Sequence, residues 1–100
     1  MLYDMGIPYR YEYPVRIYNG KIRYPDFTLL KTKTREVIYF EHFGCMDEEG
    51  YRKDTMLKMD EYRASGIYPG KNLIFTYETE DSPLDIKGTR KMLAELFQIK

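Results

Sequence analysis

The sequence is short of several features that mark particular classes of protein. It has one cysteine, Cys45, among 100 residues, which excludes an intrachain disulfide and fits a cytoplasmic, intracellular protein. No apolar run approaches the roughly 20 residues of a membrane span, and the first residues lack the basic start and apolar middle of a signal peptide. These gaps predict an intracellular protein with no membrane partner.

The chain also lacks a net charge. Its 16 Lys and Arg balance its 16 Asp and Glu, so the formal charge is zero. Without a positive global field, nucleic acid is not drawn to the whole surface, which counts against an autonomous DNA binder but leaves room for a local basic patch. The sequence has no repeat, low-complexity tract or linker, so residues 1–100 are expected to form a single domain, either whole or a fragment of a larger protein.

What the chain has is a strand-forming stretch over residues 24–44 that carries two carboxylates. Asp26 lies early in the first predicted strand, Glu41 ends the second, and the polar residues 31–34 turn the chain between them. Antiparallel pairing places the start of one strand beside the end of the other, so the two acids are expected to be neighbours. Adjacent carboxylates repel each other, and a divalent cation relieves that repulsion; two solvated strand-end acids are the other interpretation.

The order of these residues resembles the PD-(D/E)XK nuclease superfamily. Pro-Asp-Phe at 25–27, a polar turn, an apolar run and Glu-His-x-Gly at 41–44 are most similar to two of its branches. One is the very-short-patch-repair-like endonucleases, and the other is the nuclease-like segments attached to superfamily 1 helicases. The sequence departs at one position, because the usual lysine two places after the Glu is Phe43. The resemblance covers about residues 9 to 78 and continues through Tyr51, Lys58, Tyr62 and Gly66-Ile67.

A lysine on the following helix is the candidate replacement. Residues 51–65 are predicted to be helical, and Tyr51, Lys58 and Tyr62 fall on one stripe that faces the sheet. Lys58 either lays its stem on the sheet with its ammonium in water, or it is a catalytic lysine that has migrated from position 43. The resemblance implies the second role, with Tyr62 supporting it.

Two further polar residues have open roles. Glu12, on the first predicted strand, either faces the same sheet end as Asp26 and Glu41 or is a solvated strand residue, which we favour. His42 is the only histidine, and the two-residue period of a strand points it away from Glu41. It is therefore expected to hydrogen-bond or pack behind the site, although a catalytic base on a bulged strand and a metal ligand are alternatives.

Turn and cap signals predict the remaining elements. Asn19-Gly20 favours a type I′ turn, with positive φ at both residues, which joins residues 9–18 and 21–30 into a hairpin. Gly6 is expected to end a remnant of an N-terminal helix, and Gly66 to end the helix over 51–65. Residues 72–77 then form a strand, parallel to the one that ends at Glu41. A last helix is predicted to open with Ser82 as cap, Pro83 at its first position and Asp85 three residues on, with Ile86, Leu93 and Phe97 along one face.

These elements predict an α/β fold, a three-layer sandwich around a mixed four-stranded sheet. The resemblance implies a restriction-endonuclease-like core with a shortened first helix. It further implies a Mg²⁺-dependent (or Mn²⁺-dependent) deoxyribonuclease that hydrolyses phosphodiester bonds in DNA, with Asp26, Glu41 and Lys58 as catalytic residues and the two acids as metal ligands.

The missing lysine and the zero net charge favour an alternative. In it the chain is a catalytically inactive nuclease-fold module that binds DNA or docks within a helicase or DNA repair assembly, on a helicase domain of the same or another chain. A third hypothesis is an interaction domain that uses its eleven tyrosines as a contact surface.

Overall fold

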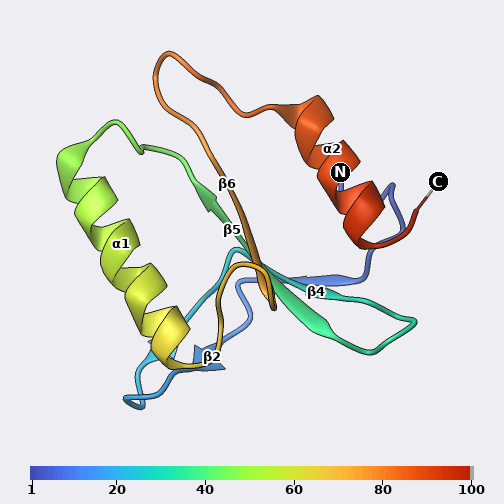
Figure 1. The fold of residues 1–100 in the computed structure, drawn as a ribbon, viewed down its shortest axis with the longest axis horizontal. Coiled ribbons are helices and arrows are strands. Elements are labelled where there is room, and N and C mark those ends of the chain that lie inside the picture. Colours follow the sequence, from blue (N-terminus) through green and yellow to red (C-terminus); the bar gives the residue numbers. More distant parts are fainter. Residues whose placement is uncertain (100) are drawn as a thin grey trace.

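The structure, a computed structural model, describes residues 1–99 and is built on a mixed four-stranded sheet (Figure 1). The strands lie in the order β1 (Tyr9–Tyr11), β4 (Phe27–Leu30), β5 (Val37–Phe43) and β6 (Leu73–Tyr77). The first three pair antiparallel, and β6 runs parallel to β5. The predicted mixed sheet is therefore confirmed, including the parallel crossover strand and the central place of the strand that carries Glu41.

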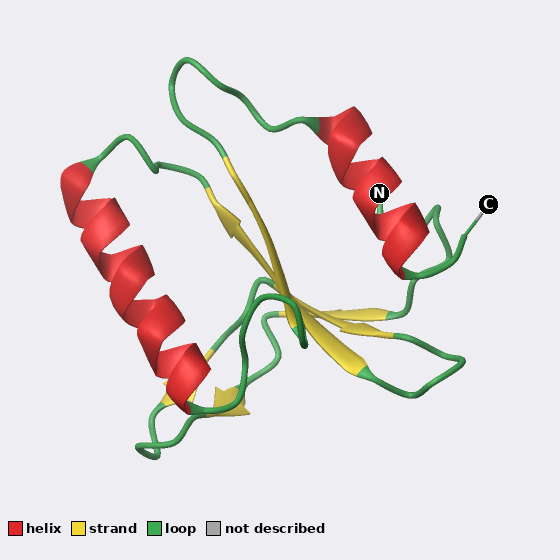
Figure 2. Ribbon diagram, in the orientation of Figure 1, coloured by secondary structure: helices red, strands yellow, loops and turns green. Residues whose placement is uncertain are grey.

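Two helices cover opposite faces of this sheet, so the protein has three layers (Figure 2). Helix α1 (Glu49–Ala64) and helix α2 (Ile86–Leu96) each cover one face, because alternate residues of β5 point to opposite sides. Ile38 and Phe40 pack under α2, and Tyr39 packs under α1. No helix in residues 1–99 is long and apolar enough to cross a membrane.

The predicted first hairpin exists, but it is divided between two sheets. Its outer part pairs as β1 with β4, whereas its tip forms a separate ribbon of β2 (Val15–Arg16) and β3 (Ile22–Arg23). The break falls at Glu12, which has a left-handed φ of 49°, and it is followed by Pro14. A left-handed residue and a proline both interrupt a regular strand, so the ribbon can turn away from the main sheet.

The type I′ turn at Asn19-Gly20 was a wrong prediction. Only Gly20 has a positive φ, 84°, and the N–H of Ile17 donates to the carbonyl of Lys21 at 2.9 Å, which leaves three residues in the loop. A three-residue hairpin loop needs the left-handed conformation only at its last position, where the glycine stands.

Both predicted helix-ending glycines are confirmed by their backbone. At the end of α1, Gly66 has φ 81°, its N–H donates to Arg63 and the N–H of Ile67 donates to Tyr62. This is the Schellman arrangement, in which a left-handed residue lets two N–H groups satisfy the last carbonyls of a helix. A single helical turn at residues 1–5 ends at Gly6 in the same manner, with φ 72°.

The last helix begins later than its sequence suggests. Its cap is Asp85, whose side chain accepts the N–H of Gly88 at 2.9 Å, and Ser82 instead closes a small turn with Thr79. The prediction of Ser82 as cap was therefore wrong. Ile86 is the first residue of the helix, and its side chain is 59% exposed, so it does not belong to the buried face. Leu93, which was predicted on the same face, is fully buried.

Candidate functional site

Glu41 lies at the centre of the candidate site, near the end of β5 and under α1. The residue is completely buried. Three donors surround the carboxylate: the backbone N–H of Asp26 donates to Oε1 at 2.9 Å, and the Tyr62 hydroxyl and the Lys58 ammonium reach Oε2 at 2.9 and 2.7 Å. A buried carboxylate is costly unless its charge is compensated, and here one cation and two hydrogen bonds compensate it.

Asp26 lies beside Glu41, directly before β4. Phe27 pairs with Phe40, so the antiparallel register brings the preceding residue opposite Glu41. The contact is reciprocal, because Asp26 Oδ2 accepts the backbone N–H of His42 at 2.7 Å while Glu41 accepts the N–H of Asp26. The two acids that the sequence placed together are thus neighbours, and each one binds a backbone amide at the end of the other strand.

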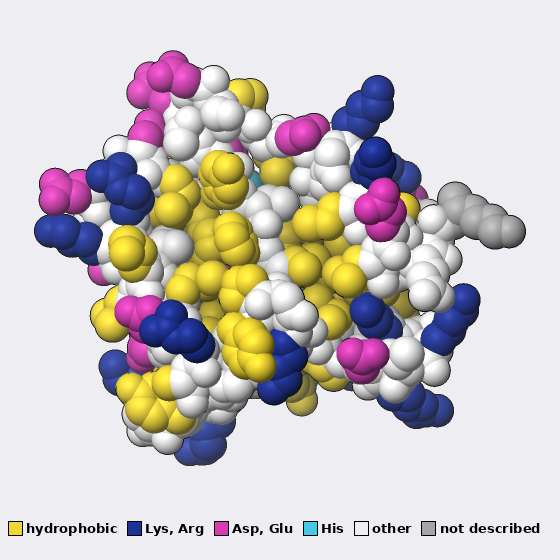
Figure 3. All heavy atoms as spheres, in the orientation of Figure 1, with side chains coloured by type: hydrophobic (Ala, Val, Ile, Leu, Met, Phe, Trp, Pro, Cys, Tyr) yellow, Lys and Arg dark blue, Asp and Glu magenta, His cyan; other side chains and the backbone are white. Residues whose placement is uncertain are grey.

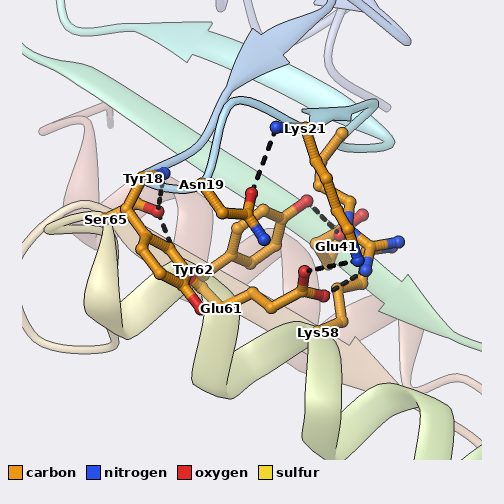
Figure 4. Close-up of polar contacts among 9 residues, drawn as sticks. Tyr18, Asn19, Lys21, Glu41, Lys58, Glu61, Tyr62 and Ser65 are labelled. Atoms are coloured by element: carbon orange, nitrogen blue, oxygen red, sulfur yellow. Dashed lines mark hydrogen bonds and ion pairs between the residues drawn. The ribbon is translucent and has the colours of Figure 1, made fainter.

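Lys58 and Tyr62 come to the site from α1, one turn apart on the face toward the sheet (Figure 4). The Lys58 side chain is 28% exposed, so its ammonium bridges the buried carboxylate and solvent. Tyr62 is completely buried, and burial together with the charge of Glu41 raises the pKa of its hydroxyl above the ordinary value. The hydroxyl therefore stays protonated and acts as a donor to Glu41.

A second buried carboxylate, Glu61, lies next to this group and was missed in the sequence. It is paired with Arg23 of β3 and, at 3.8 Å, with Lys21 (Figure 4). These contacts attach the β2–β3 ribbon to α1, as does the hydrogen bond from the Tyr18 N–H to the Ser65 hydroxyl. The sequence does contain one indication of such a partner. Lys21 and Arg23 are two residues apart on a predicted strand, so both point to the same face and could meet an acidic side chain there.

His42 points away from the site, as the strand period predicts. Its Nδ1 lies 2.7 Å from the Thr76 hydroxyl and its Nε2 lies 2.8 Å from Glu78 Oε1, both on or just after the neighbouring strand β6. This hydrogen bond lowers the pKa of Glu78 below its ordinary value. The geometry matches the role of a hydrogen-bonded residue behind the site and matches neither a metal ligand nor a base on the Glu41 face.

Glu12 and Phe43 complete the set of predicted positions. The backbone N–H of Glu12 donates to the carbonyl of Asp26 at 3.1 Å, so it lies at the same sheet end, but its side chain is exposed, as we favoured. Phe43 is buried on the Glu41 face and packs against Phe75, with ring centroids 5.8 Å apart. An apolar ring therefore occupies the place of the usual lysine, and the nearest ammonium to Glu41 comes from Lys58.

The donor set fits a magnesium ion on one condition. Mg²⁺ takes one or two protein carboxylates and keeps several waters, so the pair Asp26 and Glu41 suffices, although residues 1–99 contain no cluster of three or more metal-binding side chains. Asp26 Oδ1 accepts no hydrogen bond from residues 1–99, which leaves it available as a ligand. The Lys58 ammonium lies 2.7 Å from Glu41 Oε2 and repels a second cation, so the condition is that Lys58 moves away from Oε2 when a metal ion binds.

Comparison with known proteins adds no relative. No protein-family model matches the chain, and no curated protein sequence or solved structure matches it.

Proposed function

We propose that the chain is a Mg²⁺-dependent (or Mn²⁺-dependent) DNA nuclease of the PD-(D/E)XK type. The observation that carries the proposal is the convergence of Asp26, Glu41 and Lys58, which are remote in the sequence and come from the residue before β4, from β5 and from α1. The element order also supports it: a helical turn, a hairpin, an antiparallel strand, a helix and a parallel strand is the order of a restriction-endonuclease-like core with a shortened first helix.

In this proposal the metal ligands are the carboxylates of Asp26 and Glu41. When bound, the cation would supply a polarised phosphoryl oxygen and a water of lowered pKa. The backbone N–H of His42 orients the Asp26 carboxylate, and the Tyr62 hydroxyl orients the Glu41 carboxylate. These hydrogen bonds fix both acids before a substrate arrives, which reduces the reorganisation that the reaction requires.

Lys58 has the remaining catalytic role. Its Nζ donates to Glu41 Oε2 and is open to solvent on its other side. Once Glu41 binds a cation, the ammonium can instead donate to a phosphoryl oxygen or orient the attacking water, and in either position it stabilises the negative charge that develops on the phosphate. A lysine on α1 thus replaces the one that is absent at position 43.

The test is a cleavage assay on single- and double-stranded DNA with Mg²⁺ and with Mn²⁺. Asp26→Ala and Lys58→Ala are expected to abolish cleavage or to lower its rate by about 100-fold or more. Two exposed residues of α1 provide matched controls, Asp60→Ala and Lys53→Ala, which should cut as the unmodified chain does. Equal rates for Asp26→Ala and Asp60→Ala would contradict the assignment.

One observation favours a second candidate, an inactive nuclease-fold module that binds DNA or docks in a helicase or repair assembly. The three donors of Glu41 include the Lys58 ammonium, and a cation that already compensates the carboxylate opposes the binding of a metal ion there. Calorimetric titration with Mn²⁺ separates the two candidates. Binding that is lost in Glu41→Gln supports the nuclease, whereas no binding to the unmodified chain supports the inactive module.

A further inference from the structure

The free edge of strand β6 lies in the middle of one broad face of the molecule. The protein is flat, 38 × 36 × 21 Å, and β6 is the terminal strand of the sheet formed by residues 1–99. The view down the short axis shows hydrophobic side chains gathered at the centre of this face, between the two helices, with charged side chains mostly around the rim (Figure 3). An apolar centre with a polar rim is the usual anatomy of a protein–protein interface.

The two edges of the sheet differ in how they are protected. The other terminal strand, β1, has only three residues, begins after Pro8 and ends before the left-handed Glu12. Short strands, prolines and irregular backbone prevent an edge from pairing with another chain. Strand β6 has five residues, Leu-Ile-Phe-Thr-Tyr, without proline or charge, so its edge lacks these protections.

Backbone directions identify the groups that face outward from β6. The carbonyl of Asn72 and the N–H of Glu78 bond to β5, so even-numbered residues face β5 and odd-numbered ones face outward. Of the outward-facing residues, Leu73 and Thr79 already pair within the chain, through isolated β-bridges to Pro69 and Ser82. The outward N–H and carbonyl groups that remain belong to Phe75 and Tyr77.

The side chains beside this edge are apolar and accessible. Phe75 and Tyr77 line an open hollow of about 300 Å³ between β6 and α1, together with Met56 and Met59. Tyr77 is 60% exposed, and Met56 is also exposed. A partner strand on β6 would therefore place its own side chains over this hollow.

We propose that β6 pairs with β6 of a second copy of this chain, antiparallel and about a two-fold axis at Thr76. In this register Phe75 of each copy pairs with Tyr77 of the other. The outward N–H and carbonyl groups of Phe75 and Tyr77, four in each copy, then all have a hydrogen-bond partner. It creates two aromatic cross-strand pairs and one Thr–Thr pair, which stabilise sheets. Because the contact is isologous, it closes as a dimer and does not propagate.

Charges at the two ends of β6 agree with this register. Exposed Lys71 precedes the strand, and exposed Glu80 and Asp81 follow it. Antiparallel pairing about Thr76 brings Lys71 of each copy toward the acidic end of the other, whereas a parallel pairing would place like charges together. Complementary charge of this kind selects orientation.

Sedimentation over a concentration series tests the pairing. Because only Phe75 and Tyr77 of each copy pair across the axis, the contact is small. We therefore expect a reversible dimer with a dissociation constant between about 1 µM and 1 mM. Tyr77→Lys should be monomeric throughout, because it places a charge in the aromatic pairs. Tyr18→Lys is the matched control, since Tyr18 is 64% exposed at the hairpin tip, and it should dimerise as the unmodified chain does.

Cross-linking tests the register itself. In a Cys45→Ser background, Thr76→Cys should form a disulfide-linked dimer on mild oxidation, because residues on the axis face their own copies at a Cα distance of about 4.5 Å. Tyr77→Cys faces Phe75 of the other copy and should not cross-link. A chain that stays monomeric up to roughly 1 mM overturns the proposal. So does a dimer that Tyr77→Lys leaves intact and Thr76→Cys does not capture, or an open-ended assembly.

Discussion

At the scale of single residues, Glu41 is central to the site because its carboxylate is buried. Lys58, Tyr62 and the N–H of Asp26 contact this carboxylate. A variant that loses one donor still buries the charged carboxylate and is therefore destabilised. A variant that replaces the carboxylate with a neutral group no longer pays the cost of burying a charge. The stability of the fold and the proposed metal binding are therefore linked at this residue.

The first prediction concerns the ion pair. Lys58→Met is expected to lower the free energy of unfolding by about 1–3 kcal/mol, since Glu41 stays buried with one donor fewer. Lys53→Met, at an exposed lysine of the same helix, should change it by less than about 0.5 kcal/mol. Urea denaturation measures both. In the double variant Lys58→Met, Glu41→Gln the loss should be smaller than the sum of the single losses, and strict additivity would show that the pair is not coupled.

The second prediction uses the raised pKa of Tyr62. The ordinary tyrosine pKa is 10.0, so in the unfolded chain this hydroxyl ionises near that value, while in the fold it stays protonated. The unfolded state then releases a proton that the folded state keeps, and the stability is fully present below about pH 10 and falls as pH rises above it. Tyr62→Phe should lose less stability than the unmodified chain between about pH 9 and pH 11, as measured by urea unfolding. Parallel pH profiles for the two would contradict the assigned protonation state.

At the scale of elements, the sequence predicted each helix and the paired strands but not every junction. The strand around Ile38 was found from its continuous apolar run, and the helix around Lys58 from its period of 3.6. Both signals come from burial and extend over several residues, so both elements were predicted. The loop at Asn19-Gly20 and the start of α2 were mistaken because each depends on one or two residues. At such places another residue, here Asp85, can take the role of cap.

The third prediction compares Gly50, in the first turn of α1, with Gly66, just after its end. Gly66→Ala should destabilise the protein by about 1–2 kcal/mol, because φ is 81° there and a Cβ strains the left-handed backbone. Gly50 lies in the first turn of the helix with open space where a Cβ would be, so Gly50→Ala should stabilise by about 0.5–1 kcal/mol. Thermal unfolding followed by circular dichroism gives both signs, and two shifts of the same sign would be inconsistent with this account.

The fourth prediction separates the two candidate caps of α2. Asp85→Ala should cost about 0.5–2 kcal/mol, because the N–H of Gly88 loses its acceptor. Ser82→Ala should be nearly neutral, since its contact with Thr79 is made by the backbone. Chemical denaturation of the two variants decides between them, and a larger loss for Ser82→Ala would restore the cap that the sequence suggests.

At the scale of the whole molecule, the sheet joins two apolar clusters, and the site lies on only one of its faces. The cluster under α2 contains Leu29, Ile38 and Leu93, and the cluster under α1 contains Tyr62 and Leu73. The proximity of Asp26, Glu41 and Lys58 was predictable, because strand pairing and helix period determine it. The Arg23–Glu61 pair was not, since it depends on how the ribbon of β2 and β3 folds against α1.

The fifth prediction tests which residue anchors α2. Leu93→Ala should destabilise by about 2–5 kcal/mol, because its side chain is fully buried and its removal leaves a cavity. Ile86→Ala removes a comparable aliphatic side chain from the solvent-facing start of the same helix and should cost far less. Urea midpoints for the pair measure the difference, and similar midpoints would show that α2 is anchored elsewhere.

The register between β5 and β6 places Glu41 directly beside Phe75. Two copies joined at neighbouring Thr76 would therefore carry their acidic clusters on the same side of one eight-stranded sheet, separated by about three interstrand spacings, or roughly 15 Å. Under the proposed nuclease function, such a dimer would hold two cleavage sites against the same DNA molecule, so breaks would occur in closely spaced pairs. The cleavage rate per chain would then rise with protein concentration, and dilution to the monomer would leave single nicks.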